Sequence, residues 1–169
     1  MDAEIVSLRI LHIVPGVVWV GAAIFMALIL QPALAKAGPP HAGILMDNMV
    51  KPLTILMHSM ALLTIVIGVV LAFRMHPDGL FDVLWSTGWG WMIFIGLVFA
   101  VVGYTSGFLA SQTMKKVGIL GASFAGRPPE PAEMAEMGKL QGRGQNLTRL
   151  AALLATAAVV TMALARYAT

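Results

Sequence analysis

The chain has 169 residues, of which 59% are hydrophobic and only 11% are charged. Soluble domains carry roughly twice that share of charge, so the composition indicates a single integral membrane domain over residues 1–169. The absence of cysteine excludes disulfides, thiolate metal sites and thiol catalysis. The net charge is only +3 and the basic residues are spread over loops, so no nucleic-acid partner is expected.

Four apolar segments follow one another along the chain, each with about the 20 residues that a helix needs to cross a hydrocarbon core. They cover residues 5–30, 52–73, 89–109 and 147–165. Continuous apolar runs of this length lack the alternation of a membrane β-barrel. The sequence therefore predicts an all-α fold, an up-down four-helix bundle in the lipid bilayer. Because the acidic N-terminus lacks the basic region of a cleavable signal peptide, we expect the first segment to be retained.

Basic residues between the segments predict the orientation in the membrane. One side carries Lys36, Lys51, Lys115, Lys116, Arg127, Lys139 and Arg143. The opposite side carries only Arg9, Arg74 and Arg166. Positive charge favours the cytoplasmic side, so both termini are expected outside the cytoplasm, with a long cytoplasmic loop over residues 113–146. The expected location is the inner (plasma) membrane.

Small residues recur at three- and four-residue spacing along the third segment. Gly96, Ala100, Gly103 and Gly107 share one helix face. Such a face lets helix backbones approach closely in lipid. It could equally leave room for a flat cofactor, so the pattern fits two interpretations.

His12 and His58 lie inside the first and second apolar segments. Ionisable side chains at membrane depth are costly, and their default interpretation is functional. On the first segment, Arg9, His12, Gly16 and Trp19 share one face. This pattern suits a porphyrin, because the imidazole binds iron, the glycine gives clearance and the arginine meets a propionate.

The second segment repeats the combination of a cation and an imidazole, because Lys51 and His58 lie two turns apart. At 1.5 Å per residue, the two imidazoles of antiparallel helices are expected to differ in depth by roughly 15 Å. They cannot share one ion, so two sites are predicted, one near each membrane face. The candidates for a second ligand are Met57, Met60, His76, water or a histidine of another copy of the chain.

The most specific string of the chain runs from Leu11 to Ala23, with His12, Gly16 and then Trp19-Val20-Gly21. An aromatic residue and the sequence Gln31-Pro32-Ala33-Leu34 follow. This pattern resembles the first helix of the CopD-like membrane domain and of small bacterial membrane proteins related to it. It is more loosely similar to the membrane-bound protoporphyrinogen oxidase of the HemJ type.

The resemblance implies a four-helix membrane unit linked to copper handling or to haem b, with His12 as the first-helix ligand and His58 as the second-helix ligand. The chain lacks the outer segment rich in methionine and histidine that a dedicated copper importer has. It also has no clear match to the basic second-helix residue of the haem-biosynthesis enzyme.

Three functions are therefore weighed. The first is a haem b protein for electron transfer or for redox chemistry on a small molecule or quinone, as a homodimer or a subunit of a membrane complex. The second is a copper-handling or transport protein, because methionine and histidine suit cuprous copper. The third is an accessory subunit without a cofactor. Hydrolysis and proton pumping are disfavoured, because the spans contain no Asp or Glu. Whether the chain is an enzyme stays open.

Overall fold

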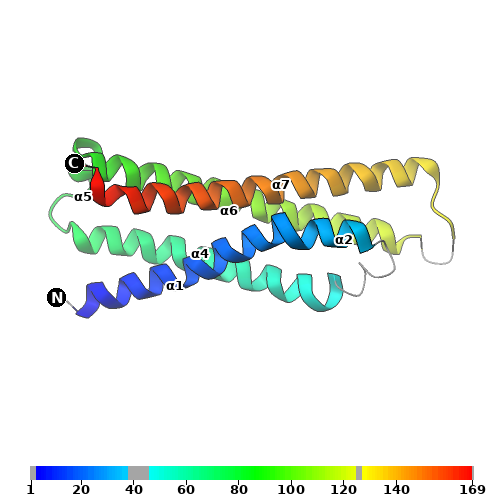
Figure 1. Cartoon of the computed structure of the whole chain (residues 1–169), viewed down its shortest axis with the longest axis horizontal. Helices are drawn as coiled ribbons and strands as arrows, with labels where there is room; N and C mark the ends of the chain where they lie inside the picture. Colours follow the sequence, from blue (N-terminus) through cyan, green and yellow to red (C-terminus); the bar gives the residue numbers. More distant parts are fainter. Residues whose placement is uncertain (1–2, 38–45, 125–126, 169) are drawn as a thin grey trace.

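The computed structural model describes residues 3–37, 46–124 and 127–168. Figure 1 shows long helices running side by side in alternating directions. The first arm consists of α1 (Ala3–Phe25), the π-helical turn η1 (Met26–Leu30) and α2 (Gln31–Ala37). A second π-helical turn, η2 (Met46–Val50), leads into α4 (Lys51–Met75). The second half comprises the short α5 (Leu80–Ser86), α6 (Gly88–Ala122), α7 (Pro131–Leu164) and the 3₁₀ turn η3 (Ala165–Tyr167). The predicted all-α, up-down bundle is confirmed.

Four helical stretches of the described chain are long and apolar enough to cross a membrane. They are Ala3–Lys36, Asn48–Met75, Gly88–Ala122 and Pro131–Tyr167. Their outward faces carry large exposed apolar side chains such as Val17, Leu28 and Ile55. Exposure of this kind suits lipid rather than water, because contiguous apolar surface is rare on soluble monomers. The protein is thus a multi-pass membrane protein with the four spans that the sequence predicts.

The helices pair into two hairpins, α1 with α4 and α6 with α7. The small-residue face of α6 lies in the second pair. A side chain added at Gly96 would meet Met162 and Thr161 of α7, and one added at Gly103 would meet Leu154 and the backbone of α7. Of the two interpretations left open for this face, close helix packing is therefore confirmed, and these glycines leave no clearance for a flat cofactor.

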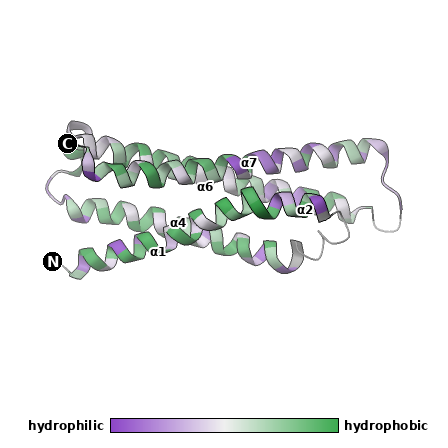
Figure 2. Cartoon of the chain, viewed as in Figure 1, coloured by the Kyte–Doolittle hydropathy of each residue, from purple (hydrophilic) through white to green (hydrophobic). Residues whose placement is uncertain are grey.

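The prediction of a long loop over residues 113–146 is wrong for most of that range, because the connection between the helices is short. Helix α6 continues to Ala122 and α7 begins at Pro131. With 35 and 34 residues, each helix is about 50 Å long, whereas a hydrocarbon core is only about 30 Å thick. The extra turns form a polar helical hairpin beyond the apolar zone, and Figure 2 shows hydrophilic residues along the first half of α7. The prediction failed because loss of hydropathy marks the end of the apolar zone rather than the end of a helix.

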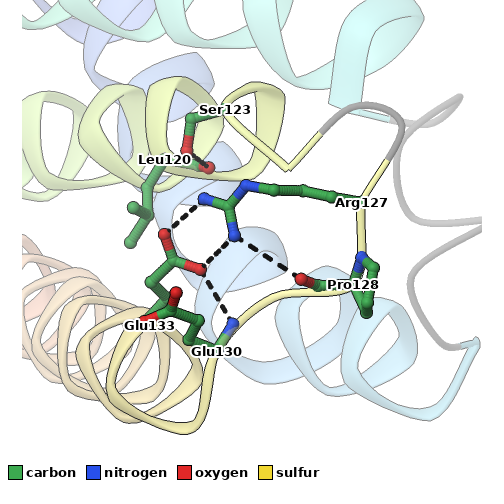
Figure 3. Close-up of polar contacts among 6 residues, drawn as sticks. All are labelled: Leu120, Ser123, Arg127, Pro128, Glu130 and Glu133. Atoms are coloured by element: carbon green, nitrogen blue, oxygen red, sulfur yellow. Dashed lines mark hydrogen bonds and ion pairs between the residues drawn. The ribbon is translucent and has the colours of Figure 1, made fainter.

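The first turn of α7 is stabilised by a capping box. The Glu133 carboxylate accepts from the backbone N–H of Glu130 at 2.8 Å and from both terminal nitrogens of Arg127 at 2.8 and 2.6 Å (Figure 3). Hydrogen bonds from Arg127 and from the Glu130 backbone lower the pKa of Glu133 to about 2, and the same contact raises the pKa of Arg127. A proline suits the first helical position, where its missing N–H is not needed. The helix therefore starts at Pro131 despite its distance from the membrane.

Candidate functional site

His12 makes a hydrogen bond that joins two helices. Its Nδ1 lies 2.8 Å from the carbonyl oxygen of Thr64, which belongs to α4. A carbonyl oxygen can only accept a hydrogen bond, so Nδ1 carries the proton and is the donor. In the neutral ring, Nε2 then holds the lone pair, which is the form that binds a metal ion. The orientation of this imidazole is therefore set by the α1–α4 pair.

Two glycines allow the close approach of α1 and α4 around His12. A Cβ atom on Gly68 would lie 2.6 Å from Cε1 of His12, which is closer than real Cβ atoms come to their neighbours. A Cβ atom on Gly16 would lie 3.3 Å from Cγ2 of Thr64, a side chain that is buried. Gly68 thus provides the space for the imidazole, and Gly16 packs against α4.

Trp19 completes the same face of α1 and is buried. Its ring belongs to a core cluster with four alanines. They are Ala61, Ala100, Ala155 and Ala158. The face predicted to carry a porphyrin therefore packs, at Gly16 and Trp19, against the chain's own helices. On this face His12 keeps a ring nitrogen, Nε2, without a described partner.

His58 has a similar hydrogen bond but different neighbours. Its Nδ1 donates to the carbonyl of Thr54, one turn earlier in α4, at 2.7 Å. The ring lies edge-on to Tyr104 and Phe108 of α6, with ring centroids 5.7 Å apart in both pairs. Its Nε2 therefore also holds the lone pair in the neutral form.

Neither free nitrogen is fully buried. Among the described residues, only one buried side-chain nitrogen or oxygen atom lacks a hydrogen-bond partner, and that atom is Oε1 of Gln31. Neither Nε2 has a described partner and neither is in that group, so both reach the molecular surface. A ligand could thus approach each imidazole from the lipid side or from a neighbouring protein.

The two imidazoles belong to separate sites. His12 is level with the stretch of α4 between Thr64 and Gly68. His58 precedes that stretch by six to ten residues, which corresponds to roughly 9–15 Å along the helix axis. One metal ion cannot bind both rings, in line with the depth difference expected from the sequence.

None of the described hydrogen bonds and ring contacts joins a predicted second ligand of the same chain to either imidazole. Met57 and Met60 pack against the core cluster around Trp19. Met57 precedes His58 by one position and Met60 follows it by two, and side chains at these spacings do not face one another on a helix. Within the described ranges, no group of three or more His, Asp or Glu side chains comes together.

His76 lies at the end of the bundle beyond α4. Its ring centroid is 4.7 Å from that of Trp89, and both residues line a cavity of about 440 Å³ with Met75, Val83, Thr87 and Ala168. His76 is eight residues beyond Gly68, or roughly 12 Å farther along the axis than His12.

The two predicted cations lie at exposed positions. Arg9 precedes His12 by one turn of α1, and Lys51 is the first residue of α4. Near Arg9 in the chain, Glu4 forms an ion pair of 3.2 Å with Arg74 of α4, and both side chains are more than half exposed. Such an exposed pair contributes little stability.

The chain matches no protein-family model, no curated protein and no solved structure. Its function is therefore argued from its own residues.

Sequence reasoning missed Thr64 and Gly68, the two α4 residues against which His12 is held. A signal was present, because Gly68 is the only glycine between Lys51 and Met75 and lies one turn after Thr64. Small and hydroxyl residues at this spacing are typical of close helix contacts in lipid.

Proposed function

We propose that this chain is a haem b-binding integral membrane protein that acts in electron transfer or in redox chemistry on a small molecule or quinone. It would hold up to two haems, one near each membrane face. Support comes from one shared feature of His12 and His58. Each Nδ1–H donates a hydrogen bond to a backbone carbonyl, which leaves the lone pair on Nε2 for an axial bond. When bound, haem supplies the one-electron chemistry.

The chain's own contribution is to orient and tune the two imidazoles. A carbonyl that accepts from Nδ1 fixes the tautomer and ring direction and raises the basicity of Nε2. For His12 this carbonyl belongs to the neighbouring helix, so the ligand direction depends on the α1–α4 contact. For His58 it belongs to the same helix, and Tyr104 and Phe108 hold the ring from the side.

A second copy of the chain is the best source of the missing ligands. The accessible Nε2 atoms point to ligation at the surface of the monomer, where a second chain would cover the porphyrin. In a symmetric dimer a residue close to the two-fold axis meets its own copy in the partner, so the same histidine of two chains could supply the two axial ligands of one shared haem. A homodimer is therefore part of the proposal.

The proposed location is the plasma membrane with both termini outside the cytoplasm. The polar hairpin of α6 and α7 carries Lys115, Lys116 and Lys139, and positively charged segments favour the cytoplasmic side. Arg9 and Lys51 lie on opposite sides of the bilayer in this orientation. Each could meet the propionates of the haem on its own side.

The deciding experiment is a visible spectrum of the full chain, purified in detergent from haem-replete cells. We expect a Soret band that shifts on addition of dithionite. The pyridine haemochrome assay should give up to two haems per chain, or up to one per chain if each haem is shared by two copies. His12→Ala and His58→Ala should each remove about half of the haem, and the double variant should remove all of it. A colourless preparation, or full loading of the double variant, would contradict the proposal.

His76→Ala is the matched control, because it removes an imidazole outside both sites. It should leave the haem content unchanged, and circular dichroism of every variant would check that the helices remain intact. Metal analysis of the same samples separates the alternatives. Copper without iron would favour the copper-handling function, and the absence of both would favour a cofactor-free subunit.

A further inference from the structure

A polar pocket lies between α2 and α7, at the end of the bundle that carries the polar hairpin. Its volume is about 100 Å³, and it is lined by Gln31, Pro32, Ala35, Gln145 and Arg149. Along the sequence, Gln31 follows the first apolar segment directly and Arg149 lies two residues into the fourth. The pocket is therefore at the boundary of the apolar zone, which is the depth of lipid headgroups.

The backbone places Gln31 in this pocket through an irregular turn. Pro32 has no N–H and its ring crowds the carbonyl one turn earlier, so the regular hydrogen-bond pattern is disturbed at this point. The chain instead forms the π-helical turn η1, and the backbone N–H of Gln31 donates to the carbonyl of Met26. Single π-helical turns of this kind are frequent at functional sites.

Hydrogen bonding fixes the direction of the Gln31 amide. The hydroxyl of Thr148 donates to the carbonyl of Gly144 at 3.0 Å, so its oxygen can only accept from Gln31. The amide nitrogen Nε2 of Gln31 therefore faces Thr148, at 2.9 Å, and Oε1 faces the other way. That oxygen is buried and has no partner among the described residues. A buried acceptor without a donor is costly, so a ligand that donates here would be favoured.

The charge around the pocket is positive. Arg149 lines it and makes no hydrogen bond or ion pair within the described chain. On α7 the nearest acidic residue is Glu136, thirteen positions earlier, or roughly 20 Å along the axis. Lys36 and Arg143 add further positive charge at the same end of the bundle. Basic pockets between membrane helices bind the headgroups of anionic lipids.

From these observations we infer that the pocket binds the headgroup of an anionic phospholipid whose alcohol carries a hydroxyl, such as phosphatidylglycerol. The phosphate pairs with the guanidinium of Arg149. The Gln31 side chain, which lines the pocket, turns its buried Oε1 towards the headgroup, and the hydroxyl donates to this oxygen. A phosphate alone would satisfy only Arg149, whereas the orphaned oxygen needs a donor. The shared chemistry, a phosphate ester bearing a hydroxyl, also occurs in soluble glycerol 3-phosphate.

Native mass spectrometry of the full chain in detergent tests this inference by lipid titration. The key comparison uses phosphatidylglycerol and phosphatidylmethanol, which have the same charge but differ in the headgroup hydroxyl. The unmodified chain should bind phosphatidylglycerol about fivefold more tightly, the effect of one net hydrogen bond. Equal binding of the two lipids would overturn the inference without any mutation.

Variants divide the effect between the two contacts. Arg149→Gln should weaken binding of both lipids about tenfold, the effect of one charge-assisted hydrogen bond. Gln31→Leu should abolish the preference for phosphatidylglycerol. Arg143→Gln makes the same charge change six residues away on another face of α7, and it should leave both affinities unchanged. An equal loss in Arg143→Gln, or binding of soluble glycerol 3-phosphate as tight as that of the lipid, would refute a lipid site at this pocket.

Discussion

His12 and Thr64 are joined across the α1–α4 interface by a hydrogen bond of 2.8 Å from a ring nitrogen to a backbone carbonyl. This bond couples two properties that are usually separate in a helical bundle. It holds two membrane helices together, and it also sets which nitrogen of the imidazole remains free. A change in the spacing of α1 and α4 should therefore alter both the stability of the bundle and the ligand chemistry of His12.

Gly68→Ala tests this coupling. The new Cβ atom would lie 2.6 Å from the His12 ring, so the ring or the helix must move. We expect a loss of about 1 kcal/mol or more in unfolding free energy from overpacking, together with loss of any ligand bound at His12. Thermal unfolding in detergent measures the first effect, and haem content measures the second.

Gly21→Ala is the control, because no atom lies within 4 Å of the Cβ position on that glycine. Alanine has the higher helix propensity, so this variant should be unchanged or more stable by up to about 1 kcal/mol. Equal behaviour of the two variants would show that Gly68 does not determine the position of the ring.

The sequence predicts the number, order and approximate position of the spans, because hydropathy reports directly on membrane depth. It fails at the ends of α6 and α7, where helix length depends on local hydrogen bonds. The capping of α7 by Glu130 and Glu133 is visible in the sequence only as residue types. A polar stretch with glycines and charges looks like a loop, yet helix pairing keeps it helical.

The candidate site could be predicted only in part. The two imidazoles and their separation in depth follow from the sequence and from helix geometry. The partner of His12 does not, because it depends on how α1 is rotated about its axis against α4. For the same reason the pattern of Gly16 and Trp19 fitted both a cofactor face and a packing face. The structure uses Gly16 and Trp19 for packing.

Gly103→Leu should loosen the α6–α7 hairpin. A Cβ atom on Gly103 would lie 3.2 Å from Cβ of Leu154 and 3.3 Å from the backbone nitrogen of Ala155, and backbone cannot move aside cheaply. We expect a loss of about 1–3 kcal/mol in unfolding free energy. Gly118→Leu is the matched control on the same helix, since it has open space around its Cβ position. If both variants unfold at the wild-type temperature, α6 and α7 do not pack through Gly103.

Single cysteines would report the orientation of the bundle, because the chain has no cysteine of its own. Lys139→Cys lies on the exposed part of α7, and Asp78→Cys lies at the exposed turn after α4. If the positive hairpin is cytoplasmic, a membrane-impermeant maleimide should label only Asp78→Cys in cells whose inner membrane is sealed and whose outer layers have been made permeable. Lys139→Cys should react only after lysis. The reverse pattern would place both termini inside the cell, and Ala100→Cys, in the buried core, should stay unlabelled throughout.

The start of α7 should open at acidic pH while the rest of the helix remains folded. The pKa of Glu133 is about 2 in the folded chain, against an ordinary value of 4.5. A lowered pKa means that the carboxylate form favours the folded turn. This contribution is complete above pH 4.5 and is lost as the pH falls from 4.5 towards 2. Because protonation removes the ion pair with Arg127 and weakens the hydrogen bond from the Glu130 backbone, the first turn of α7 should open more often.

Amide hydrogen exchange, corrected for the intrinsic rate at each pH, would measure this opening in the first turn of α7. Glu133→Gln should have a more open first turn than the unmodified chain above pH 4.5, and its opening should no longer change between pH 4.5 and 2, because a neutral amide cannot form the ion pair with Arg127 and does not titrate. Glu136→Gln lies three residues farther along the same helix and should keep the wild-type profile. If the first turn of the Glu133→Gln variant still opened between pH 4.5 and 2, another group would have to control it, and the capping box would not be the pH-sensitive element.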